Sequence, residues 1–307
     1  MIPPTPTVWI PATTRPEHRA FLPHGIDIRE VPAAGNLDGP PQHADILIAG
    51  FDYARTVEIL PQLRDLRLLQ TLSAGVDTLV DRIPRGVTLC DGSGVHDASV
   101  SEWVVIAILA MRRRLPAHVL SQLDATWSFS GGADLEGARV LIVGYGSIGR
   151  ALEARLAPFG ARIVRVARHA RDGVHSTDQL PHLLPHADAV VILLPLTSET
   201  RGMVNADFLA AMRPGALLVN AARGPIVDTD ALLAALRAER IQAALDVTDP
   251  EPLPDGHPLW SAPGVLITPH IGGAVFRVYE RGWRFAGEQV RRYLDGAPLL
   301  NVALDGY

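Results

Sequence analysis

Short apolar runs alternate with helical or turn segments along the N-terminal part of the chain. The runs with the length and composition of strands are Val8–Ile10, Asp45–Ala49, Leu68–Leu72 and Val87–Cys90. Alternation of strands with helices is typical of α/β folds. We therefore expect a sheet with helical connections in this part of the chain.

A second and more regular series of apolar runs begins at Arg139. Its strand candidates are Arg139–Val143, Arg162–Val166, Ala189–Leu194, Ala216–Asn220, Gln242–Val247 and Val265–Thr268. Helical stretches separate these runs, and the clearest are Ile148–Phe159 and Thr229–Glu239. Near-continuous apolar strands separated by helices indicate a doubly wound parallel sheet that is buried on both faces.

Two further helices are expected outside these series. Ser99 and Glu102 have the spacing of a capping box, which predicts that a largely apolar helix starts there and ends at the charged run Arg112–Arg114. The stretch Val275–Leu294 is amphipathic and is followed by Gly296, which predicts a last helix that stops at this glycine.

Composition narrows the possible partners. The 307 residues are 48% hydrophobic and 20% charged, with a net charge of −5, so no basic excess points to nucleic acid or to an anionic membrane. Small molecules are therefore the expected partners. The sequence contains no lysine, which excludes a lysine Schiff base, a P-loop lysine and a lysine general base.

Location and metal binding are predicted from local features. The start MIPPTPTVWIP lacks the basic residues and apolar run of a signal peptide, and the apolar stretch Val100–Met111 is too short for a membrane span. We expect a cytoplasmic protein. His182 and His186 have helical spacing, but no third ligand is evident, so we expect no metal.

The run GYGSIG, from Gly144 to Gly149, is a candidate dinucleotide-binding loop. It follows the apolar strand Val140–Val143 and opens the expected helix Ile148–Phe159, which is the placement that phosphate binding requires. Gly144 would allow the tight turn, Gly146 would let the backbone approach the pyrophosphate, and Gly149 would let the helix pack closely on the strand.

The run RVARHAR, residues 165–171, lies about twenty residues further on, where NAD-binding chains carry an acidic residue that bonds the ribose. Here the strand is followed by Ala167 and Arg168 instead. An arginine fork can hold a 2′-phosphate, and His169 and Arg171 would add positive potential. The run therefore favours NADPH over NADH as the cofactor. The alternative is a surface loop that collects arginines because the protein has no lysine.

Three polar side chains follow the last three strands of the second series. Arg223 comes after the strand that ends at Asn220, Glu251 lies in the loop TDPEP, and His270 lies in PHIGG. Because ligands bind at the carboxyl ends of parallel strands, we expect these groups to converge. Protonated His270 could donate to the oxygen of a 2-oxo acid as hydride arrives at carbon. Arg223 would anchor the carboxylate, and Glu251 would orient the imidazole and favour its charged form.

At these residues the sequence resembles the D-isomer-specific 2-hydroxyacid dehydrogenase family, which includes glyoxylate and hydroxypyruvate reductases. Besides GYGSIG, the resemblance rests on SAGVD (73–77), LPLTSETRGMVN (194–205), NAARGPIVD (220–228), ALDVTDPEPLP (244–254) and ITPHIGGA (267–274). The resemblance covers nearly the whole chain, and its motifs occur in the family's order. The sequence departs from the family's NAD-type pattern at Ala167 and Arg168, and Trp103 stands where many relatives have histidine or tyrosine.

The resemblance implies roles for individual residues. Arg223, Glu251 and His270 would be catalytic, and the backbone amides of Ala74 and Gly75 would hold the substrate carboxylate. Asp246 would lie beside the nicotinamide carboxamide. In full, the candidate cofactor contacts are Gly144, Gly146, Ser147, Ile148, Gly149, Arg168, His169, Arg171, Pro195, Thr197, Ala222 and Asp246.

The resemblance also implies an architecture and a function. It implies an α/β protein of two doubly wound domains, with a Rossmann-type dinucleotide-binding domain (97–275) inserted into a flavodoxin-like substrate domain (1–96 and 276–307), and a homodimer. The expected reaction is NADPH-preferring reduction of small 2-oxo acids, such as glyoxylate or hydroxypyruvate, to D-2-hydroxy acids. The alternatives are an NAD-dependent dehydrogenase that works oxidatively and a dinucleotide-sensing binding protein similar to the family's corepressors.

Overall fold

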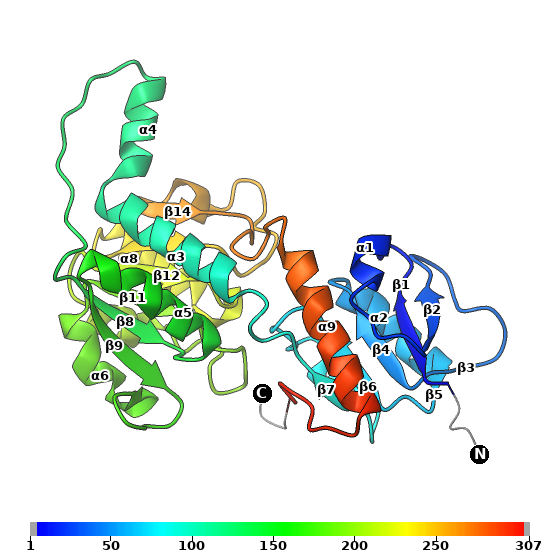
Figure 1. Ribbon diagram of the computed structural model, residues 1–307. Coiled ribbons are helices and arrows are strands. Elements are labelled where there is room, and N and C mark those ends of the chain that lie inside the picture. The colour runs from blue at the N-terminus through cyan, green and yellow to red at the C-terminus, as the bar shows by residue number, and fades with distance from the viewer. Residues whose placement is uncertain (1–4, 304–307) are drawn as a thin grey trace. The chain divides into compact units, whose positions relative to one another are not determined.

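The computed structural model describes residues 5–303 and divides the chain into two units (Figure 1). Unit 1 combines residues 1–96 with residues 276–307, and unit 2 comprises residues 97–275. Each unit has its own parallel sheet and its own hydrophobic core. The protein is therefore an α/β protein in both parts.

The sheet of unit 1 has the strand order β2-β1-β4-β6-β7, and all of its neighbouring strands are parallel. The strands are Thr7–Pro11 (β1), Asp27–Val31 (β2), Ile46–Ala49 (β4), Leu68–Thr71 (β6) and Thr88–Cys90 (β7). Counted along the chain, this is the 2-1-3-4-5 order of flavodoxin-like sheets. A short separate pair joins β3 (Gln42–His43) to β5 (Leu63–Arg64).

Helices cover both faces of this sheet. On one face, Val8, Ile10 and Ile46 pack with Trp283 of α9 (Val278–Leu294), and α1 (Pro16–Arg19) contacts the same helix. On the other face, Trp9 and Leu47 pack with Ile59 of α2 (Tyr53–Ile59). Adjacent residues of each strand thus enter different cores, as the pleat requires.

Cys90 lies in the core of unit 1 and is fully buried. Burial, reinforced by the nearby Asp91, raises the pKa of its thiol to about 11. The thiol is therefore uncharged near neutral pH, as expected of a cysteine that fills space in a core.

The sheet of unit 2 has the strand order β10-β9-β8-β11-β12-β13-β14 and is parallel throughout. The strands are Arg139–Val143 (β8), Arg162–Ala167 (β9), His175–Ser176 (β10), Ala189–Ile192 (β11), Leu217–Asn220 (β12), Gln242–Leu245 (β13) and Val265–Ile267 (β14). This is the Rossmann order 3-2-1-4-5-6 with one more strand at the end. The chain reverses direction across the sheet between β8 and β11, which is where such sheets bind their ligands.

Alternate residues of β8 face the two cores of unit 2. Val140 and Ile142 pack against α3 (Asp97–Arg112) and α5 (Ser147–Leu156). Leu141 and Val143 face the opposite core. That core is covered by α6 (Leu180–Leu183), α7 (Ala206–Ala211) and α8 (Thr229–Arg237). The central strands β8, β11, β12 and β13 are buried on both faces, which explains their largely apolar sequences.

The structure corrects the predicted start of the first long helix and confirms its predicted end at the run Arg112–Arg114. The α3 helix begins at Asp97, so Ser99 already lies inside the first turn and is buried rather than capping the helix. An acidic residue in the first turn stabilises this earlier start. The helix ends at Arg112, and a second helix follows after two residues. Arg114 adopts a left-handed conformation with φ of 54°, and the chain then continues into α4 (Leu115–Leu123).

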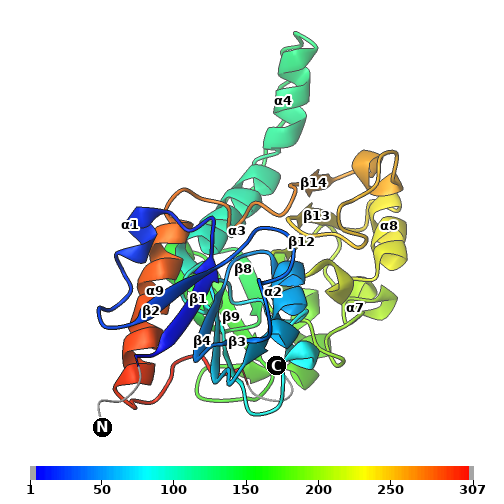
Figure 2. The same cartoon turned by 90° about the vertical axis from the view of Figure 1, so that its right-hand side faces the viewer.

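The α4 helix stands away from the sheet of unit 2 in both views (Figures 1 and 2) and has no buried residue. Leu115, Leu120 and Leu123 expose about half or more of their surfaces. Trp127 and Phe129, which follow the helix, are 99% and 96% exposed. We refer to residues 115–129 as the arm. Folded monomers rarely expose a large apolar patch, so the arm is a surface that favours association.

A helix must be long and apolar to cross a membrane. No helix within residues 5–303 has both the length and the apolar character to span a bilayer.

Candidate functional site

The run Gly144–Gly149 joins the carboxyl end of β8 to α5. Gly144 has φ of 107°, and a Cβ at this position would lie 2.5 Å from the carbonyl carbon of Leu193, so only glycine fits the turn. A Cβ at Gly149 would lie 2.9 Å from the carbonyl oxygen of Gly144. At Gly146, in contrast, a Cβ would meet nothing within 4 Å, so the space beside it is open.

The N-terminus of α5 faces this loop. Ser147 and Ile148 are its first residues, and Gly146 precedes them without a side chain that could cap the helix. The first-turn N–H groups and the positive end of the helix dipole are therefore presented to a ligand in the loop. A phosphate group has the charge and the acceptor oxygens that such a helix end binds.

The loop after β11 lies against the glycine loop. The backbone of Leu193, in that loop, is what a Cβ on Gly144 would meet. Within it, the Thr200 hydroxyl donates to the Pro195 carbonyl at 2.7 Å and accepts from the Thr197 backbone N–H at 2.8 Å. These bonds fix Pro195 and Thr197 at the point where the order of the sheet reverses. Both candidate cofactor contacts therefore flank the glycine loop.

The arginines of residues 165–171 differ in their partners. Arg168 directs Nε and one terminal nitrogen at the Glu199 carboxylate, at 3.1 and 2.7 Å, and both side chains are largely exposed. Arg171 donates to the carbonyl oxygen of Tyr145 in the glycine loop at 2.8 Å. His169 is exposed. Both arginines follow β9; Arg171 contacts the glycine loop, and Arg168 contacts the loop after β11.

Arg165 has a different role from its two neighbours. It forms two hydrogen bonds to Glu153 of α5, one of them 2.7 Å long, and Tyr145 also donates to Glu153. The Arg165 guanidinium lies 5.6 Å from the centre of the Tyr145 ring. Its hydrogen bonds lower the pKa of Glu153, and burial together with Glu153 raises the pKa of Tyr145. Arg165 is therefore used to tie β9 to α5 and to the glycine loop.

The turn that carries Arg223 is organised by a buried asparagine. Asn220, at the end of β12, accepts from the Ala222 N–H at 3.1 Å and donates to the Arg223 carbonyl at 3.0 Å. The partly buried Arg223 side chain donates to the Ala222 carbonyl at 2.7 Å. The sequence did not single out Asn220, although its position at the end of an apolar strand was a signal for a polar group with a structural task.

His270 and Glu251 are in direct contact. The His270 Nδ1 atom lies 2.6 Å from the Glu251 carboxylate, and the two side chains are 48% and 40% exposed. His270 also has φ of 54°, in the left-handed region that residues other than glycine seldom adopt. Because Nδ1 faces Glu251, the other ring nitrogen, Nε2, is the one available to a ligand.

Asp246 holds the loop that carries His270. Its buried carboxylate accepts from the Thr268 hydroxyl at 2.6 Å and from the backbone N–H groups of Ile271 and Gly272 at 2.9 and 2.7 Å. The His270 N–H donates to the Asp246 carbonyl at 2.7 Å. Asp246 therefore positions the histidine, which the sequence pattern did not indicate. Trp103 is a core residue, and a Cβ built on Gly272 would lie 3.5 Å from the Trp103 Cβ atom.

The remaining predicted contacts lie in unit 1. Ala74 and Gly75 follow β6, and the Gly75 N–H is 3.4 Å from the Ser73 hydroxyl oxygen. Unit 2 thus contains all of the candidate catalytic and cofactor residues, whereas the two candidate substrate amides belong to unit 1. Among residues 5–303, no group of three His, Cys, Asp or Glu side chains could hold a metal ion.

Comparison with known families gives one matching domain model. The model for "D-isomer specific 2-hydroxyacid dehydrogenase, NAD binding domain" matches residues 105–272. The match contains the glycine loop, the arginines after β9 and the loops of Arg223, Glu251 and His270. It therefore spans most of unit 2.

Individual proteins are similar over longer stretches. The glyoxylate reductase of Thermofilum pendens is 35% identical over 78% of this chain and 75% of its own length. The D-3-phosphoglycerate dehydrogenase of Mycobacterium tuberculosis is 33% identical over 95% of this chain, which spans only 57% of that protein. A D-isomer specific 2-hydroxyacid dehydrogenase from Xanthobacter autotrophicus Py2, solved with NADPH and MES, superposes with a TM-score of 0.85 at 31% identity, covering 99% of both chains.

Proposed function

Because the chain belongs to the D-isomer specific 2-hydroxyacid dehydrogenase family, we propose that it reduces small 2-oxo acids to D-2-hydroxy acids and prefers NADPH. The observation that carries this proposal is the contact between His270 and Glu251. Both residues follow the carboxyl ends of strands, as the glycine loop does. A histidine paired with a carboxylate is a suitable proton donor beside a bound dinucleotide.

The residues at the reversal point fit a dinucleotide. The open space beside Gly146 and the uncapped N-terminus of α5 suit the pyrophosphate. Pro195, Thr197 and Ala222 come from the neighbouring strand ends, and we assign them to the rest of the cofactor. Asp246 retains acceptor capacity for the nicotinamide carboxamide beyond its internal hydrogen bonds. The bound cofactor supplies the hydride.

Each candidate catalytic residue has a distinct task in this proposal. Arg223 pairs with the substrate carboxylate and polarises the carbonyl group. Protonated His270 donates through Nε2 to the carbonyl oxygen, while Glu251 keeps Nδ1 protonated and fixes the plane of the ring. The backbone amides of Ala74 and Gly75 are proposed as further donors to the substrate carboxylate. In the reverse direction His270 accepts the proton.

Substrate and direction are tested together by initial rates. Purified protein is mixed with NADPH or NADH and with glyoxylate, hydroxypyruvate, pyruvate or phenylpyruvate, and cofactor oxidation is followed at 340 nm. We expect turnover, with the higher kcat/KM for NADPH and for the small acids glyoxylate and hydroxypyruvate. A higher kcat/KM with NADH than with NADPH, together with oxidation of D-2-hydroxy acids by NAD, would favour the oxidative dehydrogenase. Cofactor binding with no turnover on any acid would favour a sensing protein.

The cofactor preference yields a prediction about Arg168 and Glu199. Arg168→Ala is expected to raise the Kd of NADPH about tenfold or more and to leave the Kd of NADH nearly unchanged, because only NADPH carries the 2′-phosphate. Glu199→Gln is expected to lower the Kd of NADPH up to about fivefold, because an exposed ion pair of ~0.2–1 kcal/mol no longer competes for the guanidinium. Fluorescence titration measures both constants.

The matched control for this prediction is Arg237→Ala, which removes an exposed arginine at the end of α8. It should change neither constant. If Arg168→Ala weakened the binding of NADPH and of NADH equally, the arginine would not bind the 2′-phosphate.

We further propose that the protein is a homodimer joined through the arm. Leu120 and Leu123 are 61% and 76% exposed, and burying such side chains contributes about 1.5–3 kcal/mol each. Leu120→Glu combined with Leu123→Glu is therefore expected to convert the dimer to monomers in light scattering and sedimentation. Ile28→Glu, at an exposed position on β2, is the control and should leave the mass unchanged.

The double variant could also retain the dimer mass. That result would exclude the arm as the interface, and a native protein of monomer mass would exclude the dimer itself.

We also propose a cytoplasmic location. The one cysteine is fully buried as a free thiol, which suits a reducing compartment.

A further inference from the structure

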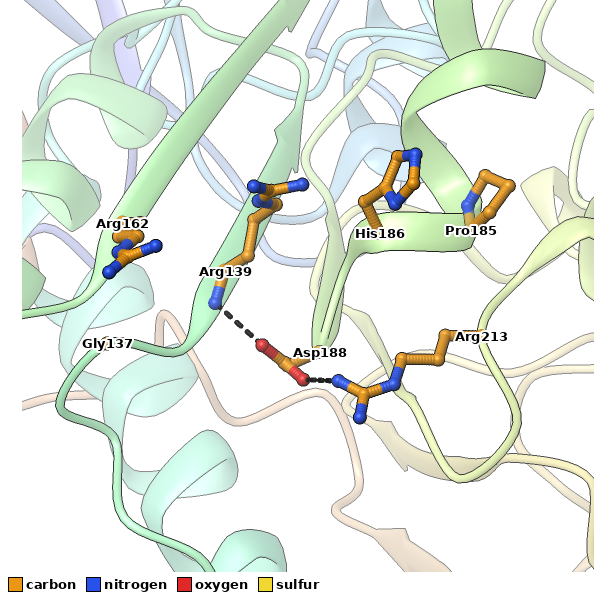
Figure 3. A pocket seen from close by; sticks show the side chains of 7 residues that line it. All are labelled: Gly137, Arg139, Arg162, Pro185, His186, Asp188 and Arg213. Carbon is orange, nitrogen blue, oxygen red and sulfur yellow. Dashed lines mark hydrogen bonds and ion pairs between the residues drawn. The ribbon is translucent and has the colours of Figure 1, made fainter.

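A cavity lies at the opposite end of the unit 2 sheet from the glycine loop. It has a volume of about 300 Å³, within the range of small-molecule sites. Figure 3 shows its lining, which consists of Gly137, Arg139, Arg162, Pro185, His186, Asp188 and Arg213. Arg139 and Arg162 are the first residues of β8 and β9, and Asp188 directly precedes β11. The cavity is therefore formed at the amino ends of the strands.

Two of the arginines are placed side by side by the register of the sheet. Arg139 and Arg162 are Cα partners on the neighbouring parallel strands β8 and β9, so their Cα atoms are about 4.8 Å apart and both side chains leave the same face. Guanidinium groups stay charged at every physiological pH. Like charges at opposing positions of a sheet are unfavourable unless an anion lies between or beside them.

The nearby acid does not neutralise this pair. Asp188 accepts from the Arg139 backbone N–H at 2.8 Å and forms an ion pair with Arg213. Figure 3 shows that the Arg139 guanidinium points away from this carboxylate. Within residues 5–303, neither the Arg139 nor the Arg162 guanidinium forms an ion pair. The cavity thus has an excess of positive charge.

We propose that this cavity is a binding site for a small phosphate-bearing metabolite. The phosphate would lie between Arg139 and Arg162, whose forks can each bind two oxygens. Arg213 and His186 would border the rest of the molecule, with Pro185 as an apolar wall. The cavity volume suits a small metabolite rather than a polymer.

The proposed site is separate from the dinucleotide loop. Arg139 and Val143 are the two ends of the five-residue strand β8. At about 3.3 Å per residue, their Cα atoms are about 13 Å apart along the strand. A ligand at Arg139 therefore leaves the glycine loop free, and the two sites can be filled at the same time.

Inorganic phosphate and pyrophosphate serve as probes. Their binding to the protein saturated with NADPH, whose own pyrophosphate then occupies the glycine loop, is measured by calorimetry at constant ionic strength, with sodium chloride as the balancing salt. We expect saturable binding that Arg139→Gln combined with Arg162→Gln weakens at least tenfold. Arg85→Ala combined with Arg237→Ala, at two exposed positions away from the cavity, removes the same two charges and should bind as the native protein does. Undiminished binding by the double variant would overturn the proposal, as would an absence of binding by the native protein.

The single variant Arg162→Gln gives an independent readout, because it is exposed at the start of β9 and is expected to fold. Removing one of two facing like charges should leave Tm unchanged or higher at low salt without phosphate. It should also remove the rise in Tm that phosphate gives the native protein. A lower Tm at low salt with the phosphate effect intact would show that Arg162 is structural, and would overturn the proposal.

Discussion

Replacing His270 with glutamine is expected to lower kcat for 2-oxo acid reduction by about 10²–10⁴-fold and to leave the Kd of NADPH nearly unchanged. Proton donation through Nε2 stabilises the transition state and contributes little to binding of the cofactor. Glu251→Gln should have a smaller effect on kcat, because the amide oxygen can still accept from Nδ1 and hold the ring, although the hydrogen bond is no longer charge-assisted.

Steady-state rates and a separate fluorescence titration distinguish these effects. His24→Gln, which changes an exposed histidine of unit 1, is the control and should behave as the native enzyme. An unchanged kcat in His270→Gln, with a loss confined to NADPH affinity, would remove His270 from the reaction and leave it a cofactor contact.

The second large effect is expected at Gly224. A Cβ at this position would lie 1.8 Å from the carbonyl oxygen of Thr248 and 2.2 Å from its carbon. Both are backbone atoms in the loop after β13, so no side chain can move aside. Gly224→Ala is therefore expected to lower the free energy of unfolding by more than about 3 kcal/mol, because the loops after β12 and β13 must separate.

Urea denaturation measures this loss. Gly131→Ala is the matched control, because a Cβ there meets nothing within 4 Å, and it should change stability by less than about 0.5 kcal/mol. Any Gly224→Ala protein that stays folded should also lose turnover, since Arg223 is the adjacent residue. Native stability in this variant would mean that the two loops are not held in contact.

The sequence predicted the sheet of unit 2 well because its central strands, β8 and β11 to β13, are buried on both faces. Such strands are continuous apolar runs in the sequence. The residues that directly follow them lie at the carboxyl ends of the strands, where ligands bind. The contact between Glu251 and His270 is consistent with this logic, since β13 and β14 are neighbours. By contrast, β2 was missed because its side chains are largely exposed and polar, and α4 because it has no buried face.

Contacts between distant loops could not be predicted from the sequence. The run 165–171 appeared as a cluster of similar arginines, yet Arg165 binds Glu153, whereas Arg168 binds Glu199, 31 residues away. The role of Asp246 depends on hydrogen bonds to residues 268–272, which only the folded chain brings together. The periodicity of apolar residues indicates which residues are buried. It does not indicate which loops contact each other in the folded chain.

The division of unit 1 between two distant chain segments has a consequence for synthesis. The α9 helix covers one face of the unit 1 sheet, and the Gln289 amide reaches back across 219 positions to the Gln70 side chain at 3.0 Å. A ribosome therefore completes unit 2 before the last part of unit 1 exists. Until α9 emerges, that apolar sheet face stays exposed to solvent. Premature termination before α9 should therefore cause misfolding or aggregation of the N-terminal part of unit 1 more than of unit 2.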